Sequence, residues 1–314
     1  MSDHNSDSTF HLNDELAARS ISFSPSDESS YVAQLLDSEP RYVPRPDYIH
    51  LCQSNAKLLT SRQDSINYIL EAHAFFEFKP ATVFLTINYF DRYLSAHMLP
   101  ETGWAFQLLL VACLSLAAKM EEMDAPLLME LQTLDSEYIF DSAAIQKMEL
   151  MVLSKLKWNL RVVTPFDYLH YFISIISSSA SDSDSFSTIY GLASSLILNT
   201  TRAVDFLEFP PSVIAAAAAI TAAGDGAVLP DTFDARISKE MVRSCHRLMD
   251  EYLLDACPSK ALSIEPLAPP SPLGVLDASV CASCDSLTEN LGSVPGSEPD
   301  HKRQRSSTPD VQES

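Results

Sequence analysis

The segment from Trp104 to Glu122, WAFQLLLVACLSLAAKMEE, is apolar on every side of a helix and then ends in charged residues. A helix without a polar face must lie inside a protein or inside a membrane. Gln107, Ser115 and the closing charges favour the interior of a protein. The segment therefore predicts a central core helix whose charged end, at Lys119, reaches the surface. A lysine on such a rigid support is well placed to contact a partner.

The composition favours a helical protein with two domains. The chain has 314 residues, enough for two ordinary cores, and only seven glycines, with no Gly-rich loop after a strand-like run. Dinucleotide-binding and P-loop folds therefore have little support.

The formal net charge of -21 would repel nucleic acid and anionic membranes, and we expect neither as a partner. The chain opens without an apolar segment behind a basic start, so we expect no secretory signal and a nuclear or cytosolic protein.

Six cysteines are scattered along the chain. Cys52, Cys113 and Cys245 lie in apolar helical surroundings and are expected to pack as small hydrophobic side chains. Cys281 and Cys284 form a CxxC pair in a Ser-rich stretch, but a zinc site needs further ligands that the neighbouring sequence does not offer. The sequence thus predicts no disulfide, no metal site and no cofactor.

Composition and hydrophobic periodicity divide the chain into five parts. Residues 1–28 are rich in Ser, Asp and Asn and are expected to be disordered. Residues 29–47 predict one short helix and a Pro-containing linker. Two dense helical blocks follow, at 48–161 and 162–258. Residues 259–314 predict a disordered tail rich in Pro, Ser and acidic residues.

Each dense block predicts helices in the same order, with the most buried helix third. The first block predicts a helix around Ile66, a second from Pro80, the core helix, a short helical stretch at 126–134, and a fifth helix after the N-cap Asp141. In the second block, the third helix is the alanine-rich run after Pro210. The expected fold is all-α, with two tandem five-helix domains.

Several long motifs resemble a known family. The runs HAFFEFKPATVFLTINYFDRYLS, WAFQLLLVACLSLAAKMEE and KMELMVLSKLKWNLRVVTPFDYLHYF closely resemble the cyclin box of plant D-type cyclins. The run SCHRLMDEYL resembles the last helix of their second box. The resemblance covers roughly residues 30–258 and implies two tandem cyclin boxes, which are five-helix folds.

The resemblance also implies a kinase-binding site. In the family, a lysine ending the third helix and a glutamate on the fifth bind a cyclin-dependent kinase at its C-helix and activation segment. The matching residues here are Lys119 and Glu149. Leu116, Met120 and Leu153 would supply apolar surroundings, because they lie within one helical turn of these charges. The alternative is that the two charges form only a salt bridge within the chain, as pairs on helix surfaces commonly do.

Some conspicuous polar residues are interpreted as structural. Asp91 and Arg92 form a charged pair on an otherwise apolar helix, but no nucleophile, second acid or metal ligand accompanies them. We expect them to tie helices together within the box. His73 and His170 occur singly on helical faces and are expected to be satisfied packing residues. The sequence thus predicts no catalytic residue.

The substrate-docking groove of the family is altered. Many cyclins bind an RxL-type motif in a groove built from a methionine, a leucine and a tryptophan around an arginine. Here the arginine is Arg62, the groove positions are Ser61, Ser65 and Tyr68, and the family's aspartate is Asn67. Two serines in place of large apolar side chains remove most of the area that would hold a substrate leucine. We therefore expect weak or altered docking.

The retinoblastoma-binding motif of the family is also missing. Plant D-type cyclins usually carry LxCxE near the N-terminus. The nearest approach here is LLDSE at residues 35–39, with an aspartate where the cysteine is needed. An aspartate would bring a charge into a site for a small apolar thiol. We therefore expect no direct retinoblastoma docking by this route.

The tail carries regulatory candidates. Ser271 and Thr308 precede prolines and fit proline-directed phosphorylation. Lys302, Arg303 and Arg305 form a minimal nuclear-import pattern. The composition of the tail also resembles that of segments in short-lived proteins. Such patterns arise by chance in disordered sequence as well.

The residues and the resemblance together imply a non-catalytic regulatory subunit. It would bind and activate a cyclin-dependent Ser/Thr kinase and control the G1/S transition in a plant nucleus. Kinase-inhibitor proteins are further expected partners. The alternative is a cyclin-fold adaptor in transcription or signalling that binds proteins without activating a kinase. An enzyme of unknown type comes third, with no group of residues to support it.

Overall fold

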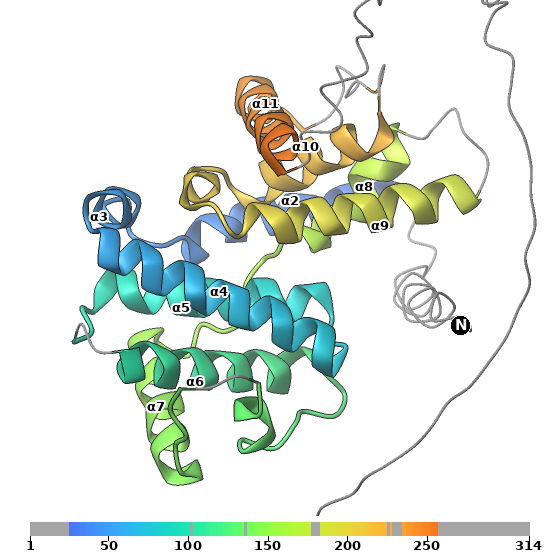
Figure 1. The fold of residues 1–314 in the computed structure, drawn as a ribbon. Coiled ribbons are helices and arrows are strands. Elements are labelled where there is room, and N and C mark those ends of the chain that lie inside the picture. Colours follow the sequence, from blue (N-terminus) through green and yellow to red (C-terminus); the bar gives the residue numbers. More distant parts are fainter. Residues whose placement is uncertain are drawn as a thin grey trace, which may run out of the picture. The chain divides into compact units, whose positions relative to one another are not determined.

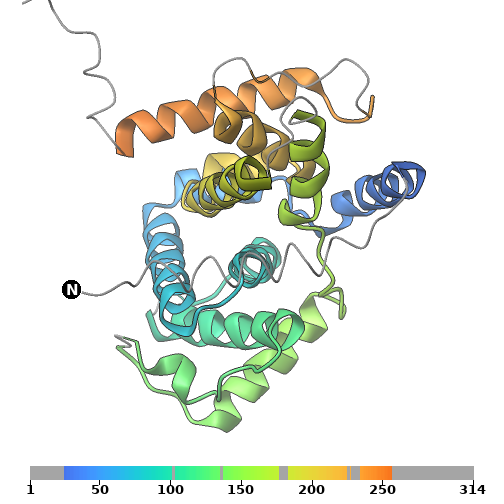
Figure 2. The same cartoon turned by 90° about the vertical axis from the view of Figure 1, so that its right-hand side faces the viewer.

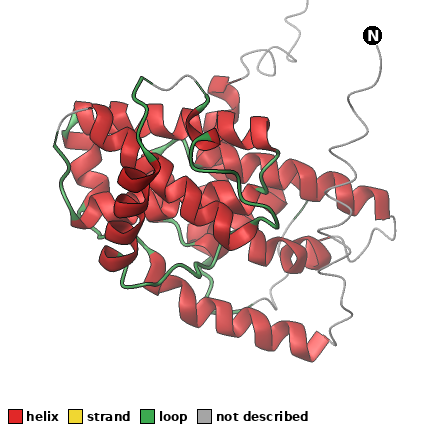
Figure 3. Cartoon of the chain, turned by 90° about the horizontal axis from the view of Figure 1, so that it is seen from below, coloured by secondary structure: helices red, strands yellow, loops and turns green. Residues whose placement is uncertain are grey.

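The computed structural model describes residues 25–100, 103–134, 137–176, 183–224, 227 and 234–256. Within these residues all regular structure is helical and no strand occurs (Figure 3). They lie in the first of the chain's two units, Met1–Ser263. The CxxC pair, both phosphorylation candidates and the import pattern lie outside the described residues.

The first half of the described chain forms a helical layer around α6. Its helices are α3 (Tyr48–Ser54), α4 (Ala56–Phe76), α5 (Pro80–Ala96), α6 (Gly103–Glu121) and α7 (Ser142–Lys155). Helix α6 packs against both α5 and α7 (Figure 1).

The predicted short helix at 126–134 is only one 3-10 turn, η2 (Glu130–Gln132). The Gln132 side chain accepts a hydrogen bond from Phe140 N (2.7 Å) and donates one to Phe140 O (3.1 Å). Side-chain hydrogen bonds therefore hold this connection where helical ones were expected.

Helix α6 has the buried position that its sequence predicts. Every residue from Leu109 to Ala118 is buried, and Ser115 is the only polar residue among them. By length and hydropathy alone the helix could cross a membrane, but most of it is buried by its neighbours. Lys119 and Met120 are the first exposed residues after this stretch. The prediction of a core helix with a charged end at the surface is confirmed.

The second half repeats this plan around a helix of small residues. Its elements are α8 (Phe166–Ile176), α9 (Ser183–Thr200), η3 (Val204–Glu208), α10 (Pro211–Ala223) and α11 (Lys239–Ala256). Helix α10 packs against α8, α9 and α11 (Figure 2). Its residues from Ser212 to Ala219 are all buried, and their small side chains let the neighbouring helices approach closely.

The N-terminal helix packs onto the second half. Helix α2 (Pro25–Ser38) buries Val32 and Leu36 in the second core, and η1 (Glu39–Tyr42) follows it. The helix already begins at Pro25, so the predicted disorder up to residue 28 extends too far. Proline suits this first helical position because its missing N–H would have no helical partner.

Glu39 is a buried anchor between η1 and the second half. Its carboxylate accepts hydrogen bonds from Tyr168 Oη (3.0 Å), Ser212 Oγ (2.9 Å) and Ser212 N (3.2 Å). Ser212 lies in the first turn of α10, where a carboxylate is favourable. Burial nevertheless raises the pKa of Glu39, because the three hydrogen bonds only partly offset the loss of water.

A buried ion pair joins three helices of the first half. Asp91 on α5 accepts bonds from Arg62 Nε and Nη2 on α4, both at 2.8 Å, and from Tyr48 Oη on α3, also at 2.8 Å. Both charged side chains are 1% exposed. Burial would lower the pKa of Arg62, but the charge and hydrogen bonds of Asp91 raise it. The expectation that Asp91 ties helices together is confirmed.

Arg92, the neighbour of Asp91, joins α5 to η1 and to the segment after α7. Its Nη1 donates to Asn159 O (3.1 Å), in the segment that leads from α7 to α8. Its guanidinium lies 5.5 Å from the centre of the ring of Tyr42, the last residue of η1. Arg92 thus has the structural role predicted for it.

We predict that Asp91→Ala lowers the free energy of unfolding by about 3–5 kcal/mol, because it leaves the Arg62 charge buried without its carboxylate partner. Replacing all three polar groups, with Arg62→Met, Asp91→Leu and Tyr48→Phe, should recover most of this loss, since no charge remains buried. Urea unfolding monitored by circular dichroism measures both effects. A cost below about 1 kcal/mol for Asp91→Ala would contradict this account.

Candidate functional site

Lys119 and Glu149 meet where the buried part of α6 ends. The Lys119 Nζ lies 2.7 Å from the Oε1 of Glu149, and Glu149 lies in the middle of α7. The lysine side chain is 46% exposed and that of the glutamate 11%. Within the described residues Lys119 pairs with Glu149 alone, so the ammonium, with three N–H groups, keeps donor capacity for another molecule. The geometry fits both a salt bridge within the chain and a charge pair that a partner covers.

Not all of the apolar residues predicted to surround the charge pair are exposed. Met120 is 41% exposed and Leu153 is half-buried, so both can contact a partner beside the charge pair. Leu116 is only 6% exposed, because it lies one turn earlier, within the buried stretch of α6. Leu116 thus packs mainly in the core, as Glu149 (8% exposed) also largely does, and its part in the contact surface stays a prediction.

Two exposed hydrophobic residues that the sequence analysis missed lie close to the pair along the chain. Leu150 directly follows Glu149 and is 61% exposed, and Met123 lies beyond the end of α6 and is 96% exposed. The pattern of α7 could have revealed Leu150. Ile145, Met148 and Val152 mark its buried face at helical spacing, and Leu150 lies away from that face.

Trp158 is a further missed residue, beyond the end of α7. It is 70% exposed, and both Lys157 (φ 54°) and Trp158 (φ 60°) have left-handed backbone conformations that non-glycine residues rarely adopt. The following residues are fixed from α5, since Tyr89 Oη donates to Leu160 O (2.6 Å) and Arg92 Nη1 donates to Asn159 O. A large aromatic side chain is thus presented to solvent by a well-supported turn.

The residues predicted for a docking groove do not share one surface. Arg62 is buried in its pair with Asp91, and Ser65 is 5% exposed and donates to Ser61 O (2.8 Å). Tyr68 is half-buried and donates to Leu131 O (2.7 Å). Arg62 and Ser65 thus point into the helical box and offer little surface to a peptide, and weak or altered docking stays a prediction.

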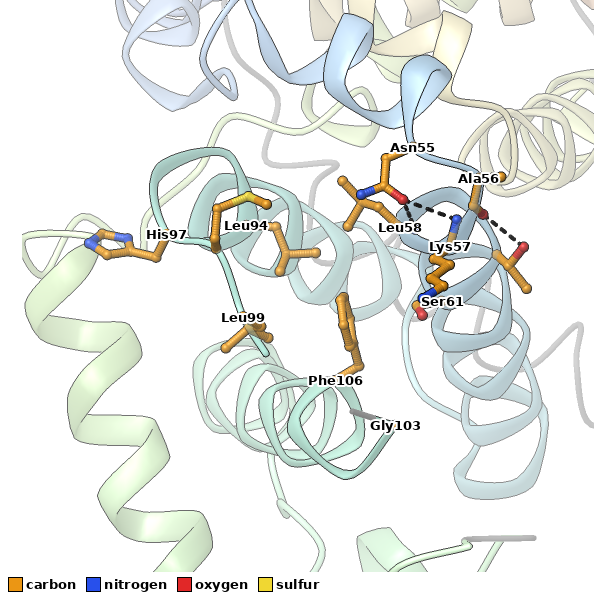
Figure 4. Close-up of a pocket in the computed structure, with 12 residues that line it drawn as sticks. Asn55, Ala56, Lys57, Leu58, Ser61, Leu94, His97, Leu99, Gly103 and Phe106 are labelled. Carbon is orange, nitrogen blue, oxygen red and sulfur yellow. Dashed lines mark hydrogen bonds between the residues drawn. The ribbon is translucent and has the colours of Figure 1, made fainter. Parts of the chain in front are cut away.

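Ser61 instead borders a pocket of about 370 Å³ between the start of α4, the end of α5 and the start of α6. Leu58, Leu94 and Phe106 lie around its apolar interior (Figure 4). Gly103, the first residue of α6, adds no side chain there. The pocket thus lies at the opposite end of α6 from Lys119.

The described His, Cys, Asp and Glu side chains offer no candidate metal centre. Within the described residues no set of three His, Cys, Asp or Glu side chains could share a metal ion. Burial lowers the pKa of His73, and a backbone hydrogen bond with Phe78 partly opposes this shift. Its Nδ1 has no hydrogen-bond partner within the described residues. His170 Nδ1 lies 3.3 Å from Glu28 Oε1 on α2.

The LLDSE stretch at residues 35–39 forms the end of α2 and the start of η1. Leu36 and Glu39 are both 8% exposed. A segment that is helical and partly buried in this way is not available as an extended docking peptide.

Comparison with known proteins identifies the class to which this fold and site belong. Residues 30–161 match the family model of the cyclin N-terminal domain, and residues 163–266 match that of the cyclin C-terminal domain. The fold resembles a viral cyclin from herpesvirus saimiri, with a TM-score of 0.54, 18% identity, and coverage of 63% of this chain and 86% of that one. It also resembles a chain of the yeast RNA Pol II CTD kinase CTDK-1 complex, with a TM-score of 0.53, 14% identity, and coverage of 69% and 74%.

Plant D-type cyclins are more similar in sequence. The chain is 36% identical to Cyclin-D4-1 of Arabidopsis thaliana over 276 residues, which cover 85% of each protein. It is 39% identical to Cyclin-D1-1 of the same species over 253 residues, or 75% of this chain and 73% of the relative. The chain therefore belongs to the cyclin family, and its two halves are a first and a second cyclin box. It is thus a regulatory subunit of a cyclin-dependent kinase in the cell cycle.

We predict that the Lys119–Glu149 pair contributes at most about 1 kcal/mol to folding, because the lysine is half exposed and solvent screens its charge. A double-mutant cycle with Lys119→Ala and Glu149→Ala, followed by urea unfolding, measures this coupling. A coupling above about 2 kcal/mol would show that the pair is mainly a structural element.

Proposed function

We propose that the first cyclin box binds the C-helix and activation segment of a cyclin-dependent kinase through the surface around Lys119 and Glu149. The kinase C-helix is thereby held inward, and the kinase active site is completed. The cyclin itself supplies no catalytic group. The observation that carries this proposal is the ion pair of a half-exposed lysine and a largely buried glutamate at the end of the buried stretch of α6. The exposed Met120 and Leu150 directly follow these two residues.

The arrangement fits the way in which charge pairs contribute to protein interfaces. A partner that covers Lys119 and Glu149 removes water from the pair, so each charge must then be matched by hydrogen bonds with fixed geometry. Met120 and Leu150 flank the pair and offer apolar surface that excludes water from it. The pair would therefore set the register of the kinase, and the apolar residues would supply much of the affinity.

Trp158 extends this surface along the segment after α7. Tryptophan is enriched among the residues that dominate binding energies, since it buries a large area at low cost in side-chain entropy. Its support from Tyr89 and Arg92 means that little ordering is needed on binding. We assign it as an additional kinase contact.

Similarity to plant D-type cyclins supports a role at the G1/S transition in a plant. We further propose a nuclear location, supported by the basic pattern at Lys302, Arg303 and Arg305. Direct retinoblastoma docking through LxCxE is not part of this proposal, because the motif is absent from the sequence.

We expect Lys119→Ala and Glu149→Ala each to weaken kinase binding at least thirtyfold, or about 2 kcal/mol, because each leaves one charge of the interface unpaired. Pull-down and titration of a purified cyclin-dependent kinase measure the loss. Arg247→Ala, which removes an exposed charge from α11 of the second box, serves as the control. Undiminished binding by both alanine variants would refute the assigned site.

The same preparation separates the activator from the adaptor role. An activator stimulates the phosphorylation of histone or of a retinoblastoma fragment by the bound kinase. Stoichiometric binding without stimulation would favour the adaptor in transcription or signalling, an alternative that the altered docking groove supports.

We predict that an RxL-type peptide binds this chain at least tenfold more weakly than it binds a cyclin with a methionine and a tryptophan in its groove. Arg62 and Ser65 are buried, and Ser61 offers little apolar surface. Kinase-inhibitor proteins that dock through such a motif should be weakened likewise. Fluorescence anisotropy with a labelled peptide measures the affinity, and an ordinary cyclin affinity would contradict the prediction.

A further inference from the structure

The beginning of α5 and the end of α6 exchange hydrogen bonds close to Lys119. The Glu122 carboxylate, directly after α6, accepts bonds from Lys79 N (2.8 Å) and from the hydroxyl group of Thr82. In return, Lys79 Nζ donates to Glu121 O (2.8 Å), the carbonyl of the last residue of α6. Each helix end thus receives a side chain from the other.

These bonds satisfy backbone N–H and C=O groups that have no hydrogen-bond partner within their own helix. The N-cap residue of α5 is Lys79, whose own side chain makes no capping bond, so Glu122 caps α5 from another element. A carboxylate is favourable at the N-terminus of a helix, and an ammonium group is favourable at a C-terminus. Both charges in the exchange therefore lie at the helix ends that stabilise them.

The position of the exchange links it to the charge pair. Glu122 follows Lys119 by three residues, and its N–H donates to Ala118 O (2.9 Å), which continues the helical turn that carries Lys119. The last turn of a helix otherwise frays readily. A fixed last turn keeps Lys119 Nζ at 2.7 Å from Glu149 on α7. Contacts that must match a partner lose much of their effect when displaced by about 1 Å.

We propose that Glu122, with Lys79, is a positioning residue for the kinase-binding Lys119. It fixes the last turn of α6 on the rigid start of α5, and it influences kinase affinity only through Lys119. This inference rests on the proposed function and concerns how that site is held in place.

The test compares variants of the full chain in titrations against a purified cyclin-dependent kinase. We expect Glu122→Ala to weaken binding about tenfold, because the last turn loses its support. Glu122→Gln keeps an acceptor oxygen for Lys79 N and Thr82, so it should stay within about threefold of the wild type. If Glu122→Ala does not fold, Thr82→Val removes one of the two bonds while keeping the side-chain shape.

Asn55→Ala provides a matched control for loss of stability. The Asn55 side chain caps α4 through Lys57 N and Leu58 N, both at 3.1 Å. It borders the pocket at Gly103, the opposite end of α6 from Lys119. We expect this variant to lower the melting temperature about as much as Glu122→Ala but to change kinase affinity by less than about twofold. Equal losses of affinity in the two variants would overturn the inference.

A double variant tests the route of the effect. If Glu122 acts through Lys119, then Glu122→Ala combined with Lys119→Ala binds no more weakly than Lys119→Ala alone. Additive losses would mean that Glu122 acts by another route and would overturn the inference. If Lys119→Ala itself leaves binding unchanged, the assigned kinase site fails and this inference fails with it. If Lys119→Ala weakens binding and Glu122→Ala does not, only the positioning role fails.

Discussion

The burial on all sides of the α6 stretch 109–118 is the constraint on which the first cyclin box depends. A helix with no polar face needs neighbours around it, and α4, α5 and α7 supply them. Its charged end can then lie only where this cover stops. Lys119 is therefore carried to the surface on a support that cannot move without disturbing the core. The same plan recurs around α10 in the second box, where alanines allow closer packing.

Helix α5 connects this core to the rest of the molecule. Asp91 fixes α3 and α4 through Tyr48 and Arg62, and its neighbour Arg92 fixes the segments on either side of the first box. The N-terminus of α5 receives Glu122 from the end of α6. The polar residues spaced along the apolar α5 thus hold the neighbouring elements in place through buried hydrogen bonds. Such bonds add specificity of arrangement where apolar packing alone would tolerate alternatives.

Much of this architecture could be predicted from the sequence, because the longest patterns were unambiguous. The apolar run of α6, the N-cap at Asp141 and the alanine run of α10 each fixed one element. Lys119 and Glu149 were paired through the family resemblance, and the structure brings them together. The direction of single side chains could not be predicted in the same way. Leu116, Arg62 and Ser65 are buried because of tertiary neighbours that periodicity does not reveal. Trp158 is exposed because two residues adopt left-handed conformations, for which the sequence gives no glycine as a signal.

The central claim is that Lys119 and Glu149 contact a kinase and do more than pair with each other. Exchanging the two charges, with Lys119→Glu and Glu149→Lys together, tests this directly. The exchanged pair can still form a salt bridge within the chain, but it presents each charge in the wrong place to a partner. We predict that the exchanged protein keeps its melting temperature and loses activation of a purified cyclin-dependent kinase. Full activation by the exchanged protein would contradict the account, because it would show that only the internal salt bridge matters.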